Sequence, residues 1–106
     1  MPLKLHRAKR ARGSSIGRYT EFCTPEEVWE EDFELRDYPT FNANGLVKKL
    51  ISLTGISPRQ GVLNEFRVDC IYFKLNKYDI EDEKLKNFIE WLEPIAEAED
   101  CILGEW

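Results

Sequence analysis

The stretch DIEDEKLKNFIEWLEPIA, residues 79–96, decides the fold class because it carries the clearest helical pattern in the chain. Asp79 stands where a helix N-cap is expected, and Pro94 is expected to kink or end the helix. Trp91 lies at the edge of the apolar stripe. The stripe itself recurs at helical spacing and consists of Leu85, Phe88, Ile89, Leu92, Ile95 and Ala96. Such a stripe must pack on another element, so the flanking segments should supply a sheet.

The two flanks of this helix have the composition of strands. Residues 66–75 are rich in β-branched and aromatic side chains, and the run Ile71-Tyr72-Phe73 suggests that both faces of this strand are covered. Residues 101–104, Cys-Ile-Leu-Gly, form the expected last strand. We therefore predict a C-terminal β-α-β unit over residues 66–106. Its strands run parallel, or antiparallel if Pro94 redirects the chain.

Two further helices are expected toward the N-terminus. The sequence Thr24-Pro-Glu-Glu27 has a capping Thr, a first-turn Pro and a Glu three residues after the cap. Residues 33–35 either continue this helix or alternate as a strand, and Tyr38-Pro39 ends it in both cases. The next helix runs from about Asn44 to Thr54, with Gly55 at its C-terminal cap.

These elements predict a small α+β domain, with two to three helices packed on a short sheet. A chain of 106 residues that is 42% hydrophobic has enough apolar material for one core. We expect a basic N-terminal arm over residues 1–18 and a single α+β domain over residues 19–106. We expect the arm to be mobile or ordered by a partner. Residues 1–12 lack apolar content and carry like charges, so we expect them to be dispensable for folding and needed for binding an anionic surface.

Charge is sorted into blocks along the chain. The formal charge is +6 over residues 1–18, −7 over residues 19–37, +4 over residues 38–78 and −8 over residues 79–106, which gives the net charge of −5. Blocks of one sign attract surfaces of the opposite sign and affect association more than fold. The sequence therefore indicates at least one charged partner.

The apolar runs and the cysteines of the chain predict its subcellular location and the redox state of its thiols. No apolar run is long enough to span a bilayer, and no hydrophobic stretch follows the basic leader, so we expect a cytoplasmic protein and no membrane partner. An organelle transit peptide is the alternative for the leader. Cys23, Cys70 and Cys101 are odd in number and widely spaced, which favours free thiols in a reducing compartment.

No motif names a reaction. The one histidine, His6, lies in the arm, so no relay with Ser or Cys can be built in the body. A zinc site from His6 and the three cysteines would lack close ligand pairs, and a calcium loop over residues 79–90 has Lys84 where Gly is needed. We predict no catalytic residue, no metal and no cofactor. A small enzyme that uses Asp69 or Asp79 as acid or base is a third, weaker hypothesis.

Residues 46–60, LVKKLISLTGISPRQ, have the outline of a helix-turn-helix. In that reading Arg59 and Gln60 would contact base edges, while a capped helix followed by a loop into a strand explains the same residues. The alternative function is thus a nucleic-acid-binding regulator. Its candidate residues for nucleic acid or another anionic surface are Lys4, Arg7, Lys9, Arg10, Arg12, Lys48, Lys49, Arg59 and Gln60.

The leading hypothesis is a non-catalytic binding protein, that is, an adaptor, inhibitor or assembly subunit. Trp29 lies in a segment dense in carboxylates, and an aromatic anchor ringed by acids suits a basic partner surface. The chain also ends on a tryptophan, a residue type enriched at interfaces. The candidate contacts with a protein partner are Glu27, Trp29, Glu30, Glu31 and Trp106.

Overall fold

The computed structural model describes residues 3–10, 33–59 and 61–106. In this part of the chain, five strands form one antiparallel sheet and three helices accompany it, which confirms the α+β class. The strands are β1 (Lys4–Arg10), β2 (Phe33–Leu35), β3 (Phe41–Asn42), β4 (Val62–Leu63) and β5 (Cys101–Glu105). The helices are α2 (Val47–Thr54), α3 (Glu65–Leu75) and α4 (Glu83–Glu97). None of these helices is long and apolar enough to cross a membrane.

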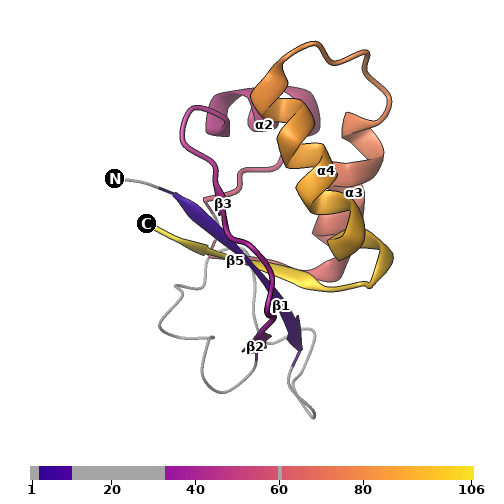
Figure 1. Ribbon diagram of the computed structural model, residues 1–106. Helices are drawn as coiled ribbons and strands as arrows, with labels where there is room; N and C mark the ends of the chain where they lie inside the picture. Colours follow the sequence, from indigo (N-terminus) through magenta and orange to yellow (C-terminus); the bar gives the residue numbers. More distant parts are fainter. Residues whose placement is uncertain (1–2, 11–32, 60) are drawn as a thin grey trace.

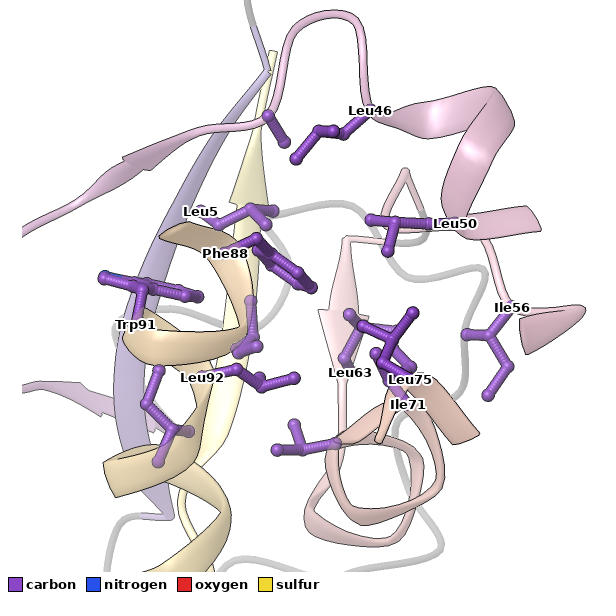
Figure 2. Packing of buried hydrophobic residues seen from close by; sticks show 14 of the residues in the cluster. Leu5, Leu46, Leu50, Ile56, Leu63, Ile71, Leu75, Phe88, Trp91 and Leu92 are labelled. Carbon is purple, nitrogen blue, oxygen red and sulfur yellow. The ribbon is translucent and has the colours of Figure 1, made fainter. Parts of the chain in front are cut away.

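The sheet has the spatial order β2-β1-β5-β4, and β3 also pairs with β1. Figure 1 shows the three helices together on one side of the β1–β5 pair. The main core lies between these two layers, and Figure 2 shows side chains of α2, α3 and α4 converging with Leu5 of β1 and Leu63 of β4. At its centre Phe88 is fully buried and meets Phe41 edge-on, with ring centroids 5.3 Å apart.

Strand β5 is buried on both faces. Ile102 belongs to the main core, whereas a second buried cluster contains Cys101 and Leu103, which alternate with Ile102 along the strand. The remaining members of the second cluster are Ala8, Phe33 and Val62. Since successive side chains of a strand point to opposite faces, an unbroken apolar run is what a doubly covered strand requires. The last strand predicted from the sequence is confirmed, and it is the central, doubly covered one.

The predicted basic arm is wrong for residues 4–10, which form β1. Residues Lys4 to Ala8 pair with β5, and the strand also pairs with β2 and β3. Leu3, Leu5 and Ala8 are fully buried. Burial of these three apolar side chains favours the sheet position although cations surround them in sequence. The backbone N–H and C=O groups of β1 also find hydrogen-bond partners in the strands on both of its edges. The remaining arm residues, 1, 2 and 11–18, lie outside the described residues, as does the predicted helix that begins at Thr24.

The predicted strand over residues 66–75 is also wrong, because this segment is helix α3. Its buried side chains are Val68, Ile71 and Leu75, which lie on one helical face. Asn64 caps the helix, and its side chain accepts a hydrogen bond from the Arg67 backbone N–H. The β-branched and aromatic composition was a weaker constraint than this spacing and cap. The C-terminal unit is therefore α3-α4-β5 and not β-α-β.

Helix α4 is the helix predicted from residues 79–96, with two differences. Its N-cap is Asp82, whose side chain accepts from the Leu85 N–H, and not Asp79. Pro94 lies inside the helix and does not end it. Because proline has no backbone N–H, the carbonyl one turn earlier in the helix lacks its usual hydrogen-bond donor. Pro94 is exposed, so water can bond to that carbonyl instead. Ile95 and Ala96 are buried and pack the last turn against the core.

The end of α4 sets the start of β5. Glu99 adopts a left-handed conformation with φ 56°, its N–H bonds to the Ala96 carbonyl, and the Asp100 N–H bonds to the Ile95 carbonyl. These two bonds form a Schellman motif, which reverses the chain directly after the helix. Asp100 is consequently fixed at the junction between α4 and β5.

Helix α2 begins at Val47, three residues later than predicted, and ends as expected at Gly55, which has φ 75°. No second helix follows in the described residues 56–59 and 61–63. Ser57 Oγ accepts from the Arg59 N–H in a local turn, and the chain then enters β4. The helix-turn-helix outline is therefore wrong, and the loop into a strand is correct. Residues 33–35, left open as helix or strand, are strand β2.

Candidate functional site

A buried carboxylate ties three parts of the fold together. Asp100 is 4% exposed and accepts a hydrogen bond from Arg7 Nε at 2.8 Å and from Arg36 Nε at 3.1 Å. The Arg7 guanidinium also lies over the Tyr38 ring, 4.7 Å from its centroid. Hydrogen bonding to Asp100 raises the pKa of Arg36 above its usual value. This cluster could not be predicted from the sequence, because Asp100, Arg7 and Arg36 are distant in sequence and no local motif links them.

The cluster changes how Arg7 is interpreted. Its side chain is only 15% exposed and already faces a carboxylate, so its role in the structure is to stabilise the junction of β1 with β5. The predicted contact of Arg7 with an external anion stays untested.

Other predicted cations are partly engaged within the protein. Lys9 Nζ lies 3.3 Å from Glu34 Oε2 on the exposed surface, and Lys49 pairs with Asp82. The Asp82 carboxylate accepts hydrogen bonds from Lys49 and from backbone N–H groups, which lowers its pKa. Lys4 is exposed and stands opposite Glu105 in the β1–β5 register. Arg12, Gln60 and the side chain of Arg10 lie outside the described residues.

Two predicted cations share one hollow. A cavity of about 360 Å³ beside the start of α2 is lined by Gly45, Val47, Lys48 and Arg59. Lys48 and Arg59 are exposed and belong to different segments, α2 and the loop before β4. The fold therefore brings together two of the residues predicted to contact an anion. No local sequence pattern pointed to the wall residues Gly45 and Val47.

Trp106 lies at the same end of the molecule. A Cβ atom on Gly104 would come within 3.3 Å of the Pro58 carbonyl oxygen and 3.5 Å of Trp106 Cζ3, so both flank Gly104. Pro58 directly precedes Arg59 in the chain. The Trp106 side chain remains 42% exposed. The other four predicted partner contacts, residues 27 and 29–31, lie outside the described residues.

Helices α3 and α4 present a different surface, acidic and aromatic. Glu83, Glu90 and Glu97 are exposed and spaced by seven residues, so they lie in one line along the outer face of α4. On α3, Phe66 and Phe73 are 60% and 64% exposed and are also seven residues apart. These two phenylalanines belong to the segment that was predicted to be a buried strand. Their spacing, read as helical, would have put them opposite Val68 and Ile71.

The two helices pack side by side at this surface. Tyr72 of α3 lies near Glu93 and Glu97 of α4, and its pKa is raised by burial and by hydrogen bonding to Glu93. Lys77 Nζ is 4.5 Å from the centroid of the Phe73 ring. Tyr72 therefore has acidic neighbours on α4, while Phe73, the next residue, has a lysine over its ring.

The remaining titratable groups do not form a reactive constellation. Cys101 is buried, and its Sγ donates a hydrogen bond of 3.1 Å to Glu65 Oε2. His6 Nε2 lies 3.9 Å from Glu105 Oε2, and burial lowers the pKa of His6. In the described part of the chain, no three His, Cys, Asp or Glu side chains are grouped to hold a metal ion.

Comparison with protein-family models, with curated proteins and with solved structures gave no match.

Proposed function

We propose that this chain is a non-catalytic binding protein that docks a basic surface of a partner protein. The observation that carries the proposal is the line of exposed carboxylates on α4, formed by Glu83, Glu90 and Glu97. The opposite face of the same helix is buried in the core, so α4 is held rigidly with its acidic face outward. A fixed row of one sign steers an oppositely charged surface and speeds its association.

Exposed aromatic side chains on the neighbouring helix α3 supply the apolar part of an interface. Phe66 and Phe73 lie on the outer face of α3, which packs against α4. Interfaces combine a desolvated aromatic centre with a polar rim, and the aromatic residues contribute most of the binding free energy. A basic partner surface with an apolar centre matches this arrangement of charge and aromatic area. The predicted contribution of Trp29 and its neighbouring glutamates, Glu27, Glu30 and Glu31, belongs to the same proposal.

A cytoplasmic location is part of the proposal. Cys70 and Cys101 are free thiols, which fits a reducing compartment. In the described residues 56–59 and 61–63, the alternative, a nucleic-acid-binding regulator, has no recognition helix after α2. Of its described candidate contacts, Lys48 and Arg59 share one hollow.

The test compares two charge-reversal variants of equal net charge. Capture from nuclease-treated native lysate uses wild type, the triple variant Glu83→Lys, Glu90→Lys, Glu97→Lys, and the control Asp37→Lys, Asp79→Lys, Glu105→Lys. All six side chains are exposed. A partner docked on α4 should be bound by wild type and by the control, and lost with the α4 variant. Equal loss with both variants would mean that only net charge matters, which contradicts docking on α4.

The purified partner then separates charge from aromatic contacts. The α4 reversals should lower the association rate about 10-fold or more at low salt, because they remove steering. Phe73→Ala should raise the dissociation rate with little change in association. Unchanged association with the reversals would refute the proposal.

A further inference from the structure

We propose that the hollow beside α2 binds the phosphate of a nucleotide unit in single-stranded nucleic acid, with Trp106 stacking on a base. This inference is independent of the protein-docking proposal, because it concerns the opposite charge and a different surface. It rests on the residues that line the hollow and on the position of Trp106.

The charges of the hollow favour an anion. Lys48 and Arg59 are its only charged lining residues among the described part of the chain, and both are cations. Lys49, the next residue in sequence, forms a salt bridge with Asp82, which neutralises its charge. Arg offers a planar fork of donors and Lys a compact point charge, and the two together are a common arrangement around phosphate oxygens.

The size and shape of the hollow suit one nucleotide unit better than a bare ion. A volume of about 360 Å³ is at the lower end of the range of small-molecule sites. Val47 provides an apolar wall, and Gly45, with φ 83° and no atom within 4 Å of where its Cβ would be, leaves the entrance open. The side of the hollow at Gly45 therefore faces open space.

Trp106 provides the second contact. Its exposed ring flanks Gly104 and Pro58, and the residue after Pro58 is Arg59. Proteins that bind single strands without sequence preference combine cations that follow the backbone with aromatic rings on which bases stack. A Cβ atom at Gly104 would crowd the Pro58 carbonyl oxygen at 3.3 Å and would touch the Trp106 ring at an ordinary contact distance of 3.5 Å.

The experiment measures binding of the full chain to a 5′-fluorescein-labelled ten-nucleotide oligo-dT by fluorescence anisotropy over a salt series. The variant Lys48→Ala, Arg59→Ala is compared with Lys77→Ala, Lys86→Ala, which removes the same charge from exposed sites on other elements. The hollow variant should bind at least about 10-fold more weakly than the control. Its plot of log K against log salt should be shallower than that of the control by about 0.7, the value for one phosphate contact with a single strand.

Trp106→Ala tests the stacking contact and should weaken binding roughly 5- to 100-fold, with Trp106→Phe retaining most of the affinity. Duplex DNA of the same length should bind more weakly than the single strand, because its bases are not available for stacking. Equal loss in the hollow variant and the control would overturn the phosphate site. Unchanged binding in Trp106→Ala, or competition by inorganic phosphate as effective as that by thymidine monophosphate, would overturn the nucleotide assignment.

Discussion

Arg7 and Asp100 lie 93 positions apart in the sequence, and the Arg7 Nε donates a hydrogen bond of 2.8 Å to Asp100 Oδ2. The contact joins β1 to the turn that connects α4 with β5. Arg36, which follows β2, donates to the same carboxylate. One buried acid thus fixes the relative positions of three segments of the sheet layer.

Substitution of this acid should destabilise the fold. Asp100→Asn leaves two guanidinium groups facing a neutral amide, and loss of one partner of a buried ion pair costs about 3–5 kcal/mol. We expect a loss of about 2–3 kcal/mol, because Arg36 is 41% exposed and stays partly solvated. Urea denaturation measures the change. Arg36→Gln serves as control and should have a clearly smaller effect, so an equal loss in both variants would contradict the central role of Asp100.

Phe88→Ala should cost about 3–5 kcal/mol in the free energy of unfolding, since it removes a large side chain from a closely packed site. Phe88 is fully buried and meets Phe41 and Trp91 with ring centroids 5.3 Å and 6.0 Å away. Phe73→Ala is the matched control, because Phe73 is 64% exposed and its loss should change stability by less than about 0.5 kcal/mol. Thermal or urea unfolding that ranks the two variants equally would contradict this core.

Elements with regular hydrophobic periodicity and recognisable caps could be predicted from the sequence. The stripe from Leu85 to Ala96 predicted α4, and the apolar run at Cys101 predicted β5, because burial leaves a direct trace in residue type. Gly55 likewise marked the end of α2. Periodicity and caps depend on residues close together in the sequence, so they can be recognised from one sequence alone.

Residue composition gave the wrong secondary structure where tertiary packing determines it. The segment around Ile71 has strand-like residues, but its side chains at 68, 71 and 75 have helical spacing, and packing against α2 and α4 selects the helix. Around Arg7 the cations concealed the alternation of Leu3 and Leu5. The hollow of Lys48 and Arg59 depends on the path of the loop before β4, which no local pattern encodes.

The position of β1 reverses the expectation that the N-terminal segment is dispensable. A chain that begins at Gly13 lacks the strand that pairs with β2, β3 and β5. It also lacks the fully buried Leu3 and Leu5. We expect this truncated chain to lose cooperative thermal unfolding and to give few dispersed amide resonances. A chain that begins at Leu3 should melt like the full protein, and a cooperative melt of the Gly13 chain would contradict the sheet order.

The cysteines should differ in reactivity. Cys70 is exposed on α3, whereas Cys101 is 1% exposed and lies beside Glu65. Thiolate is the reactive form, so burial next to a carboxylate should slow the reaction of Cys101. In a Cys23→Ser background, a disulfide reagent such as DTNB should titrate one thiol quickly in the native protein and two in urea. Two fast native thiols would contradict the burial of Cys101.

The last prediction concerns pH. Burial lowers the pKa of His6 below its ordinary 6.5, the charge of Glu105 acts in the opposite direction, and Lys4 lowers the pKa further. The unfolded chain therefore takes up this proton at a higher pH than the folded protein does. Stability from the neutral imidazole is present above pH 6.5 and is lost as the pH falls from 6.5 toward the folded pKa.

The free energy of unfolding of wild type and His6→Gln, measured between about pH 7.5 and 5, isolates this contribution from that of the carboxylates. The wild type should lose stability more steeply than the variant on acidification, with the difference confined to the range below pH 6.5. Glu105→Gln should lose stability more steeply than wild type, because it removes the Glu105 charge, which raises the pKa of His6. Parallel curves, or a wild type that gains stability relative to His6→Gln at low pH, would show that attraction to Glu105 outweighs burial.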